Sequence, residues 1–182
     1  MRFLRRKGVD AYGIEPAAPI FARFLADQPQ FFALTIDEFA DSPEAGRFSA
    51  VIACDVIEHV ERPDRFLSKI ASLLEPGGML FISTPDVASV FARLCGSRWH
   101  YYNHYHLSYL SRTTIAQIAA GSRLEEVAFA RLPRFRSLSY LIQYLADFVV
   151  GRGGFRAPAR LDELAIPINL FDTMYVAFEK RE

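Results

Sequence analysis

The chain has 182 residues, of which 51% are hydrophobic, enough for one compact domain with a real core and too few to argue for two. Its 21 basic and 21 acidic residues give a formal net charge of zero, which disfavours a general nucleic-acid binder. Cys54 and Cys95 lie in apolar stretches, which is typical of free thiols in a reducing compartment. The start MRFLRRKG lacks the apolar run of a secretory signal. No apolar run is long enough to span a membrane. We therefore expect one cytoplasmic domain over 1–182.

In chain order, short apolar runs typical of strands alternate with longer stretches whose apolar residues recur at helical spacing. Such alternation predicts an α/β fold with a doubly wound, mostly parallel sheet. The expected elements are a strand at 9–15, a helix at 19–27, strands at 31–35 and 48–55, a helix at 62–74, a strand at 79–84, helices at 86–95 and 111–121, a strand at 124–132, a helix at 137–150 and a strand at 171–180.

Local signals support several of these elements. The run at 48–55 is nearly all apolar, as expected for a strand covered on both faces. The Pro-Gly-Gly sequence at 76–78 is expected to end the preceding helix, and Ser111 and Gly121 stand where an N-cap and the residue just past a helix end belong.

In such a sheet, ligands bind outside the carboxyl ends of the strands, so the residues at strand ends are the site candidates. A carboxylate at Glu15 can accept hydrogen bonds from both hydroxyls of a ribose, or it can cap the following helix. The segment TIDEFAD, 35–41, can meet an adenine edge, with Ile36 and Asp37 as contacts, or form a solvated acidic loop.

The segment WHYYNHYHLSYL, 99–110, gathers aromatic residues and three histidines. It suits a wall around an organic acceptor, and an aromatic core is the alternative. His104 and His106 could suggest a metal, but no third ligand stands at usable spacing, so we predict no metal site.

One long stretch carries a family resemblance: FSAVIACDVIEHVERPDRFLSKIASLLEPGGMLFISTPD, 48–86. It resembles the middle of class I S-adenosylmethionine-dependent methyltransferases, in the group that includes the ubiquinone-biosynthesis O-methyltransferases. VDAYGIEP resembles the second strand of that family, TIDEF its third-strand loop, and DTMYVAFEK its last strand. The resemblance covers most of 3–132 and 171–180, and it implies a Rossmann-like fold with an antiparallel last strand.

The resemblance also assigns roles around the cofactor S-adenosylmethionine. It implies that Glu15 holds the ribose hydroxyls, that Ile36 and Asp37 contact the adenine, and that Cys54 and Asp55 lie beside the methionine and sulfonium part. The acceptor is then a small organic molecule, a sugar or a lipid-linked compound.

In such an enzyme the methyl group is already activated, so the protein mainly aligns the lone pair of the acceptor, with a base to take a proton. Histidine suits that role because its unperturbed pKa is about 6.5. His59, His104 and His106 are the candidates, and we favour His59 and His106. The alternative for His59 is a structural hydrogen bond that fixes its loop.

The first strand of the family and its glycine-rich loop have no counterpart here, and MRFLRRKG matches the later turns of the helix that follows that loop. We therefore expect a truncated methyltransferase with weak or no cofactor binding. The missing strand would lie between 9–15 and 48–55 and leave two edges unpaired. The alternatives are a non-catalytic module acting in protein association and, with no recognisable hydride-transfer site, an NAD-dependent dehydrogenase.

The remaining segment, 133–170, lies outside the resemblance as an insertion. Residues 131–160 hold six arginines against one acid, Asp147, interleaved with an apolar helix. This pattern indicates a lid or an interfacial helix that meets a phosphate-bearing or membrane-resident acceptor, which would be a peripheral membrane contact. The alternative is a solvated rim over a helix that belongs to the core or to a dimer surface.

Overall fold

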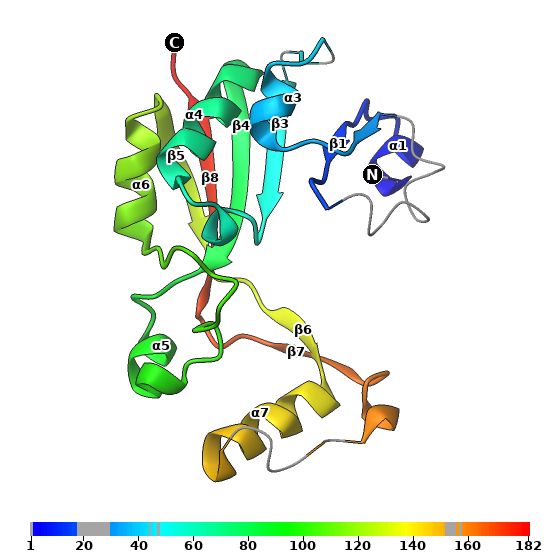
Figure 1. The fold of residues 1–182 in the computed structure, drawn as a ribbon, viewed down its shortest axis with the longest axis vertical. Helices are drawn as coiled ribbons and strands as arrows, with labels where there is room; N and C mark the ends of the chain where they lie inside the picture. The colour runs from blue at the N-terminus through cyan, green and yellow to red at the C-terminus, as the bar shows by residue number, and fades with distance from the viewer. Residues whose placement is uncertain (1, 18–29, 44, 47, 152–155, 157) are drawn as a thin grey trace.

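A computed structural model describes residues 2–17, 30–43, 45–46, 48–151, 156 and 158–182 (Figure 1). The helix expected at 19–27 lies outside these residues. The main sheet has the strand order β3-β4-β8-β5. Its strands are β3 (Phe48–Cys54), β4 (Leu74–Pro85), β8 (Thr173–Lys180) and β5 (Leu124–Ala130).

β3 and β4 run parallel, whereas β8 lies between β4 and β5 and is antiparallel to both. The predicted antiparallel last strand is therefore confirmed. Two helices, α4 (Pro63–Leu73) and α6 (Arg112–Ala120), contact each other and pack on one face of this sheet (Figure 1).

The core lies between these two helices and the sheet. Apolar residues three and four apart put Leu67 and Ile70 on the inner side of α4, where both are almost fully buried. Ile115 of α6 and Leu80 of β4 complete the same cluster. The helix boundaries follow the predicted signals, because the Ser111 hydroxyl accepts a hydrogen bond from the Thr114 N–H.

The opposite face of the sheet is open over the described residues. Ile52 of β3 is 60% exposed and its neighbour Phe81 of β4 is 43% exposed. Alternate residues of a strand point to opposite faces of the sheet. Both α4 and α6 cover one face, and Ile52 and Phe81 point to the other. The expectation that 48–55 is covered on both faces is therefore wrong for the part of the chain described.

The N-terminal region contains α1 (Arg2–Arg6) and a separate parallel pair, β1 (Gly13–Ile14) with β2 (Phe31–Phe32). Both strands are shorter than predicted. Among the described residues, no strand pairing joins the β1-β2 pair to β3. The outer edge of β3, which the sequence predicted to lack a partner, therefore has no partner strand among these residues. Instead, aromatic rings link β1, β2, α3 and β3: Tyr12, Phe32, Phe39 and Phe48.

Helix α3 (Ile36–Ala40) was predicted only as a loop. Thr35 and Glu38 form a capping box, in which each side chain bonds the backbone N–H of the other. The irregular start of β4, directly after α4, needs glycine, because a Cβ on Gly78 would lie 2.8 Å from the Glu75 carbonyl oxygen, and Gly77 has φ +76°.

Residues 131–172 form an extension that we call the arm (Figure 1). It contains the antiparallel pair β6 (Arg134–Ser137) and β7 (Ala165–Ile168) and the helix α7 (Leu138–Val150). The short helix α5 (Val90–Cys95) follows β4 and faces the arm, because the Cys95 thiol contacts the Tyr144 hydroxyl of α7. Over the described residues, no helix is both long and apolar enough to cross a membrane.

Candidate functional site

A cavity of about 660 Å³ lies at the carboxyl ends of β1 and β3, as the sheet topology predicts. Its wall combines apolar side chains with carboxylates, a lining that fits an adenosine, since the base is flat and largely apolar and the ribose offers two hydroxyls. Five of the predicted site residues line it: Glu15, Ile36, Asp37, Asp55 and His59.

Glu15 follows β1 at the rim of this cavity. One of its carboxylate oxygens, Oε1, accepts a hydrogen bond from the Ala17 N–H at 3.0 Å. The carboxylate thus stabilises the local turn with one oxygen, and its alternative role as a cap concerns a helix that lies outside the described residues. Its predicted contact with a ribose stays a prediction.

Ile36 and Asp37 form the first turn of α3. The Asp37 carboxylate accepts a hydrogen bond from the Arg65 guanidinium of α4 at 3.1 Å and lies 3.9 Å from the Lys69 amino group. This ion pair holds α3 against α4. Both residues line the cavity, and their predicted contacts with an adenine stay predictions.

Asp55 comes directly after β3 and has a φ of +53°, a backbone conformation that aspartate tolerates better than most residues. Its carboxylate accepts a hydrogen bond from the Ser83 hydroxyl at 3.0 Å and pairs with the Arg134 guanidinium of the arm. The neighbouring Cys54 has an exposed side chain and is not among the residues that line the cavity. Its predicted cofactor contact stays a prediction.

Two of the three candidate histidines contact each other, and one of them, His59, lines the cavity. His59 Nδ1 lies 2.7 Å from the Tyr105 carbonyl oxygen, which can only accept, so Nδ1 carries a proton and Nε2 is the nitrogen that can accept one. The His106 ring packs edge-on at 4.8 Å between ring centroids. Burial, and then the charge of His59, lower the pKa of His106. His104 is exposed.

Glu58 is a residue whose role the sequence did not reveal. Its side chain is 2% exposed and accepts a hydrogen bond from the Thr84 hydroxyl at 3.0 Å. Its backbone carbonyl accepts a second one from the Leu107 N–H at 2.8 Å, which ties the turn of His59 to the loop of His106. Burial raises the pKa of the Glu58 carboxyl. The Glu-His pair in the loop after the strand at 48–54 was the available signal.

The ligand atoms of Glu58, His59 and His106 all lie within 4.8 Å of one another. Spacing along the chain offered no third metal ligand beside His104 and His106, because the other two donors come from a distant segment. The absence of a metal site stays a prediction.

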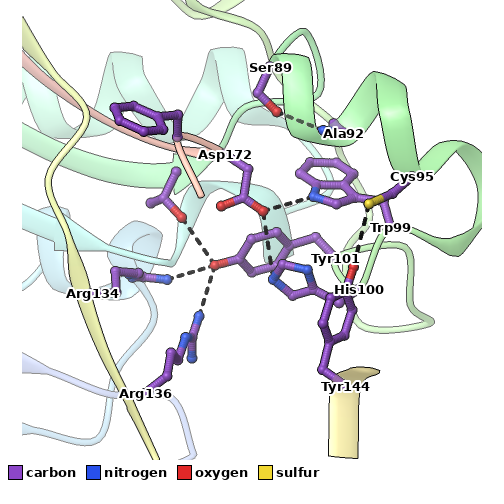
Figure 2. A network of polar contacts seen from close by, with 12 residues as sticks. Ser89, Ala92, Cys95, Trp99, His100, Tyr101, Arg134, Arg136, Tyr144 and Asp172 are labelled. Atoms are coloured by element: carbon purple, nitrogen blue, oxygen red, sulfur yellow. Dashed lines mark hydrogen bonds and ion pairs between the residues drawn. The ribbon is translucent and has the colours of Figure 1, made fainter. Parts of the chain in front are cut away.

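The aromatic segment 99–110 is partly core and partly polar network (Figure 2). Trp99 is fully buried, and its Nε1–H donates to the Asp172 carboxylate at 2.9 Å. The Tyr101 hydroxyl accepts hydrogen bonds from Arg134 at 2.9 Å and from Arg136 at 3.1 Å. The alternative of an aromatic core therefore holds for Trp99, and the predicted wall around an organic acceptor stays a prediction.

The arginines of the arm lie in two kinds of environment. Arg131 and Arg134 form ion pairs with Asp86 and Asp55 inside the molecule, whereas Arg156 and Arg160 are exposed. The alternative of a solvated rim is wrong for Arg131 and Arg134, because acids at the ends of two strands, the buried Asp86 and the partly exposed Asp55, pair with them. Membrane contact through the arm stays a prediction.

The sheet with its flanking helices defines an α/β protein with a cavity at its strand ends. A family model described as a methyltransferase domain matches residues 1–127, and the chain belongs to that family. The family and fold predicted from the sequence, a class I methyltransferase with a Rossmann-like sheet, are confirmed.

Curated relatives resemble short parts of the chain. The mitochondrial ubiquinone biosynthesis O-methyltransferase of Dictyostelium discoideum is 40% identical over 50 residues, which cover 28% of this chain and 16% of the relative. The ubiquinone biosynthesis O-methyltransferase of Azorhizobium caulinodans is 33% identical over 87 residues, which cover 44% of this chain and 34% of the relative. These matches thus span about a third or less of each relative.

Solved structures share the fold over nearly the whole chain. The match to a SAM-dependent methyltransferase from Archaeoglobus fulgidus has a TM-score of 0.64 at 12% identity. It covers 98% of this chain and 80% of the Archaeoglobus chain. The match to the 1,6-didemethyltoxoflavin-N1-methyltransferase of Burkholderia thailandensis, with bound 1,6-didemethyltoxoflavin and S-adenosylhomocysteine, has a TM-score of 0.55 at 12% identity. It covers 100% of this chain and 65% of the Burkholderia chain. At this identity the likeness concerns the fold.

Proposed function

We propose that the chain acts as an S-adenosylmethionine-dependent methyltransferase on a small-molecule acceptor. The observation that carries this proposal is the convergence of Glu15, Ile36, Asp55 and His59 on one cavity at the strand ends. Bound S-adenosylmethionine supplies a sulfonium methyl group that is already activated for transfer. Family membership and the shared fold support this choice of cofactor.

In this proposal, the nucleoside occupies the strand-end cavity. Glu15 holds the ribose hydroxyls, Ile36 packs on the adenine, and Asp55 borders the methionine part. Because Arg134 is paired with Asp55, the arm contributes directly to this wall of the site.

The base is His59. Its Nδ1–H bond to Tyr105 leaves Nε2 as the acceptor for a proton from the substrate. His106 and Glu58 act as positioning residues, since the first packs on the His59 ring and the second fixes the turn that carries it.

We expect weak cofactor binding by the 182-residue chain, because its sequence contains no glycine-rich loop after a buried strand to approach the amino-acid end. The test is calorimetric titration of S-adenosylmethionine into the chain and its Glu15→Ala variant. Losing charge-assisted hydrogen bonds is expected to weaken binding by about 10-fold or more. Glu163→Ala removes an exposed acid of the arm and serves as the control.

Equal affinities of Glu15→Ala and the parent chain would overturn the ribose assignment. Complete absence of binding would remove the catalytic proposal for this chain and favour a second candidate, a non-catalytic module acting in protein association. The open apolar face with Ile52 and Phe81 favours that candidate. It requires concentration-dependent self-association or a stable protein partner, which sedimentation velocity measures.

A further inference from the structure

Arg134, the first residue of β6, links the arm to the strand-end cavity. Its guanidinium pairs with the Asp55 carboxylate, and Asp55 lines that cavity, whereas Arg134 itself is not among the lining residues. Any effect of Arg134 on the cavity therefore passes through Asp55. The family model matches residues 1–127, so this arginine lies outside the matched part of the chain.

Three hydrogen bonds fix the Arg134 side chain, which is 22% exposed. Nη2 donates to Asp55, and Nη1 donates to the Tyr101 hydroxyl at 2.9 Å (Figure 2). Nε donates to the Tyr175 hydroxyl at 3.3 Å. Over the described part of the chain, Asp55 is the one anion that pairs with this arginine.

The Asp55 carboxylate is held on both oxygens. Oδ1 accepts a hydrogen bond from the Ser83 hydroxyl at 3.0 Å, and Oδ2 accepts the one from Arg134. The Asp55 side chain remains 40% exposed, so it borders the open cavity. Burial lowers the pKa of His106 most strongly, and the charge of Asp55 opposes that shift. Asp55 thus lies within electrostatic reach of the histidine pair.

The arm neutralises this one charge of the cavity. The other charged residues that line the cavity are Glu15, Asp37, Glu61, Arg62 and Arg65. Among the described residues, the ion pairs of these side chains are formed within α3 and α4 and the turn before α4, and none involves the arm. The charge balance at Asp55 therefore depends on the arm, whereas the rest of the lining does not.

The proposed reaction changes the charge beside Asp55. S-adenosylmethionine carries a sulfonium cation, and after methyl transfer its sulfur is the neutral thioether of S-adenosylhomocysteine. By Coulomb's law, an unpaired carboxylate beside the sulfur attracts the cation but not the thioether. Such an attraction stabilises the state before transfer, and stabilisation of the ground state alone does not accelerate the reaction.

We propose that Arg134 is a positioning residue that neutralises Asp55, so that the cavity favours the sulfonium cofactor over its thioether product less than Asp55 alone would. The inference rests on the proposed function, in which Asp55 borders the methionine and sulfonium part of the cofactor. Because β6 is held by its pairing with β7, the arm as a whole sets this charge balance.

The test is calorimetric titration of the 182-residue chain and its variants with S-adenosylmethionine and with S-adenosylhomocysteine. Arg134→Gln leaves Asp55 unpaired and should raise the ratio of the two affinities by about fivefold in favour of the sulfonium, since the pair is partly exposed and screened. Arg134→Lys keeps the charge and should largely retain the parent ratio. Arg160→Gln, at an exposed arginine of the arm, is the matched control and should change it by less than about twofold.

Two further variants separate the charge of Arg134 from its role in folding. Asp55→Asn leaves Arg134 unbalanced and should shift the ratio toward the thioether, whereas the double variant Arg134→Gln with Asp55→Asn should return it to the parent value. If thermal unfolding shows that Arg134→Gln alone is not folded, the comparison of these two variants isolates the charge of Arg134.

An unchanged ratio in Arg134→Gln, or equal ratios in Asp55→Asn and the double variant, overturns the inference and leaves the proposed function intact. Equal weakening of both ligands in Arg134→Gln also overturns it, because a purely structural role affects both ligands alike. Absence of binding of either ligand by the parent chain removes the proposed function, and the inference is rejected with it.

Discussion

The strand-end cavity and the arm pocket are built in different ways. The cavity takes its shape from β1 and β3 and the segments that follow them, on a sheet packed against α4 and α6. The cavity of about 460 Å³ between α7 and the segment after α5, which we call the arm pocket, depends on side chains that meet across long stretches of chain, such as Cys95 with Tyr144 and Arg98 with Phe148. A site on a strand end thus follows from local sequence, whereas the arm pocket follows from a few long-range contacts.

Trp99→Ala should have the largest effect, because it removes the central side chain between the two regions. Loss of a buried aromatic costs about 3–5 kcal/mol, to which the unpaired Asp172 carboxylate adds. Urea unfolding measures the change in the free energy of unfolding. Tyr105→Ala, in the same segment but 77% exposed, should cost less than about 0.5 kcal/mol. A similar small loss in Trp99→Ala would show that the arm is held by other contacts.

His59→Ala should reduce kcat by about 100-fold at saturating cofactor, because the free Nε2 acceptor is lost. Turnover is measured with an acceptor that supports methyl transfer, beside cofactor affinity, which should change little. His104→Ala removes an exposed histidine of the same aromatic segment and is the matched control. Full turnover by His59→Ala would exclude an essential base at this position.

His100 makes the arm sensitive to acid. Since its folded-state pKa is about 4 and the usual value is 6.5, the unfolded chain binds the proton first as pH falls. Stability should therefore drop by on the order of 2 kcal/mol between pH 6.5 and pH 4. His100→Gln should lose that part of the pH dependence. Parallel stability curves for the two proteins would contradict a neutral buried ring.

Glu58, behind the strand-end cavity, should respond in the opposite direction and with the smallest effect. Its pKa is raised above 4.5 by burial, so its contribution to stability is present below that pH and is lost as pH rises through the folded pKa. The difference in stability between the parent chain and Glu58→Gln should shift against the parent chain as pH rises from 4.5. A constant difference would show that this carboxyl titrates normally.

Much of the fold was predictable, because its signals are local. The strand at 48–54, the helix at 63–73 and the helix capped by Ser111 follow from apolar spacing and capping. The capping box of Thr35 and Glu38 was also local, although it was interpreted as a loop. β6 and β7 were not predicted, since four-residue strands rich in arginine or proline have no clear alternation.

By itself, the sequence determined the family and the positions of Glu15, Ile36, Asp55 and His59 at strand ends, because strand and helix periods depend on neighbouring residues. The tertiary structure decided which of these side chains face one another and which partner each one has. Arg134 reaches Asp55 across 79 positions of sequence, and His106 reaches His59 across a loop. Such contacts result from the packing of whole elements, which no local pattern encodes.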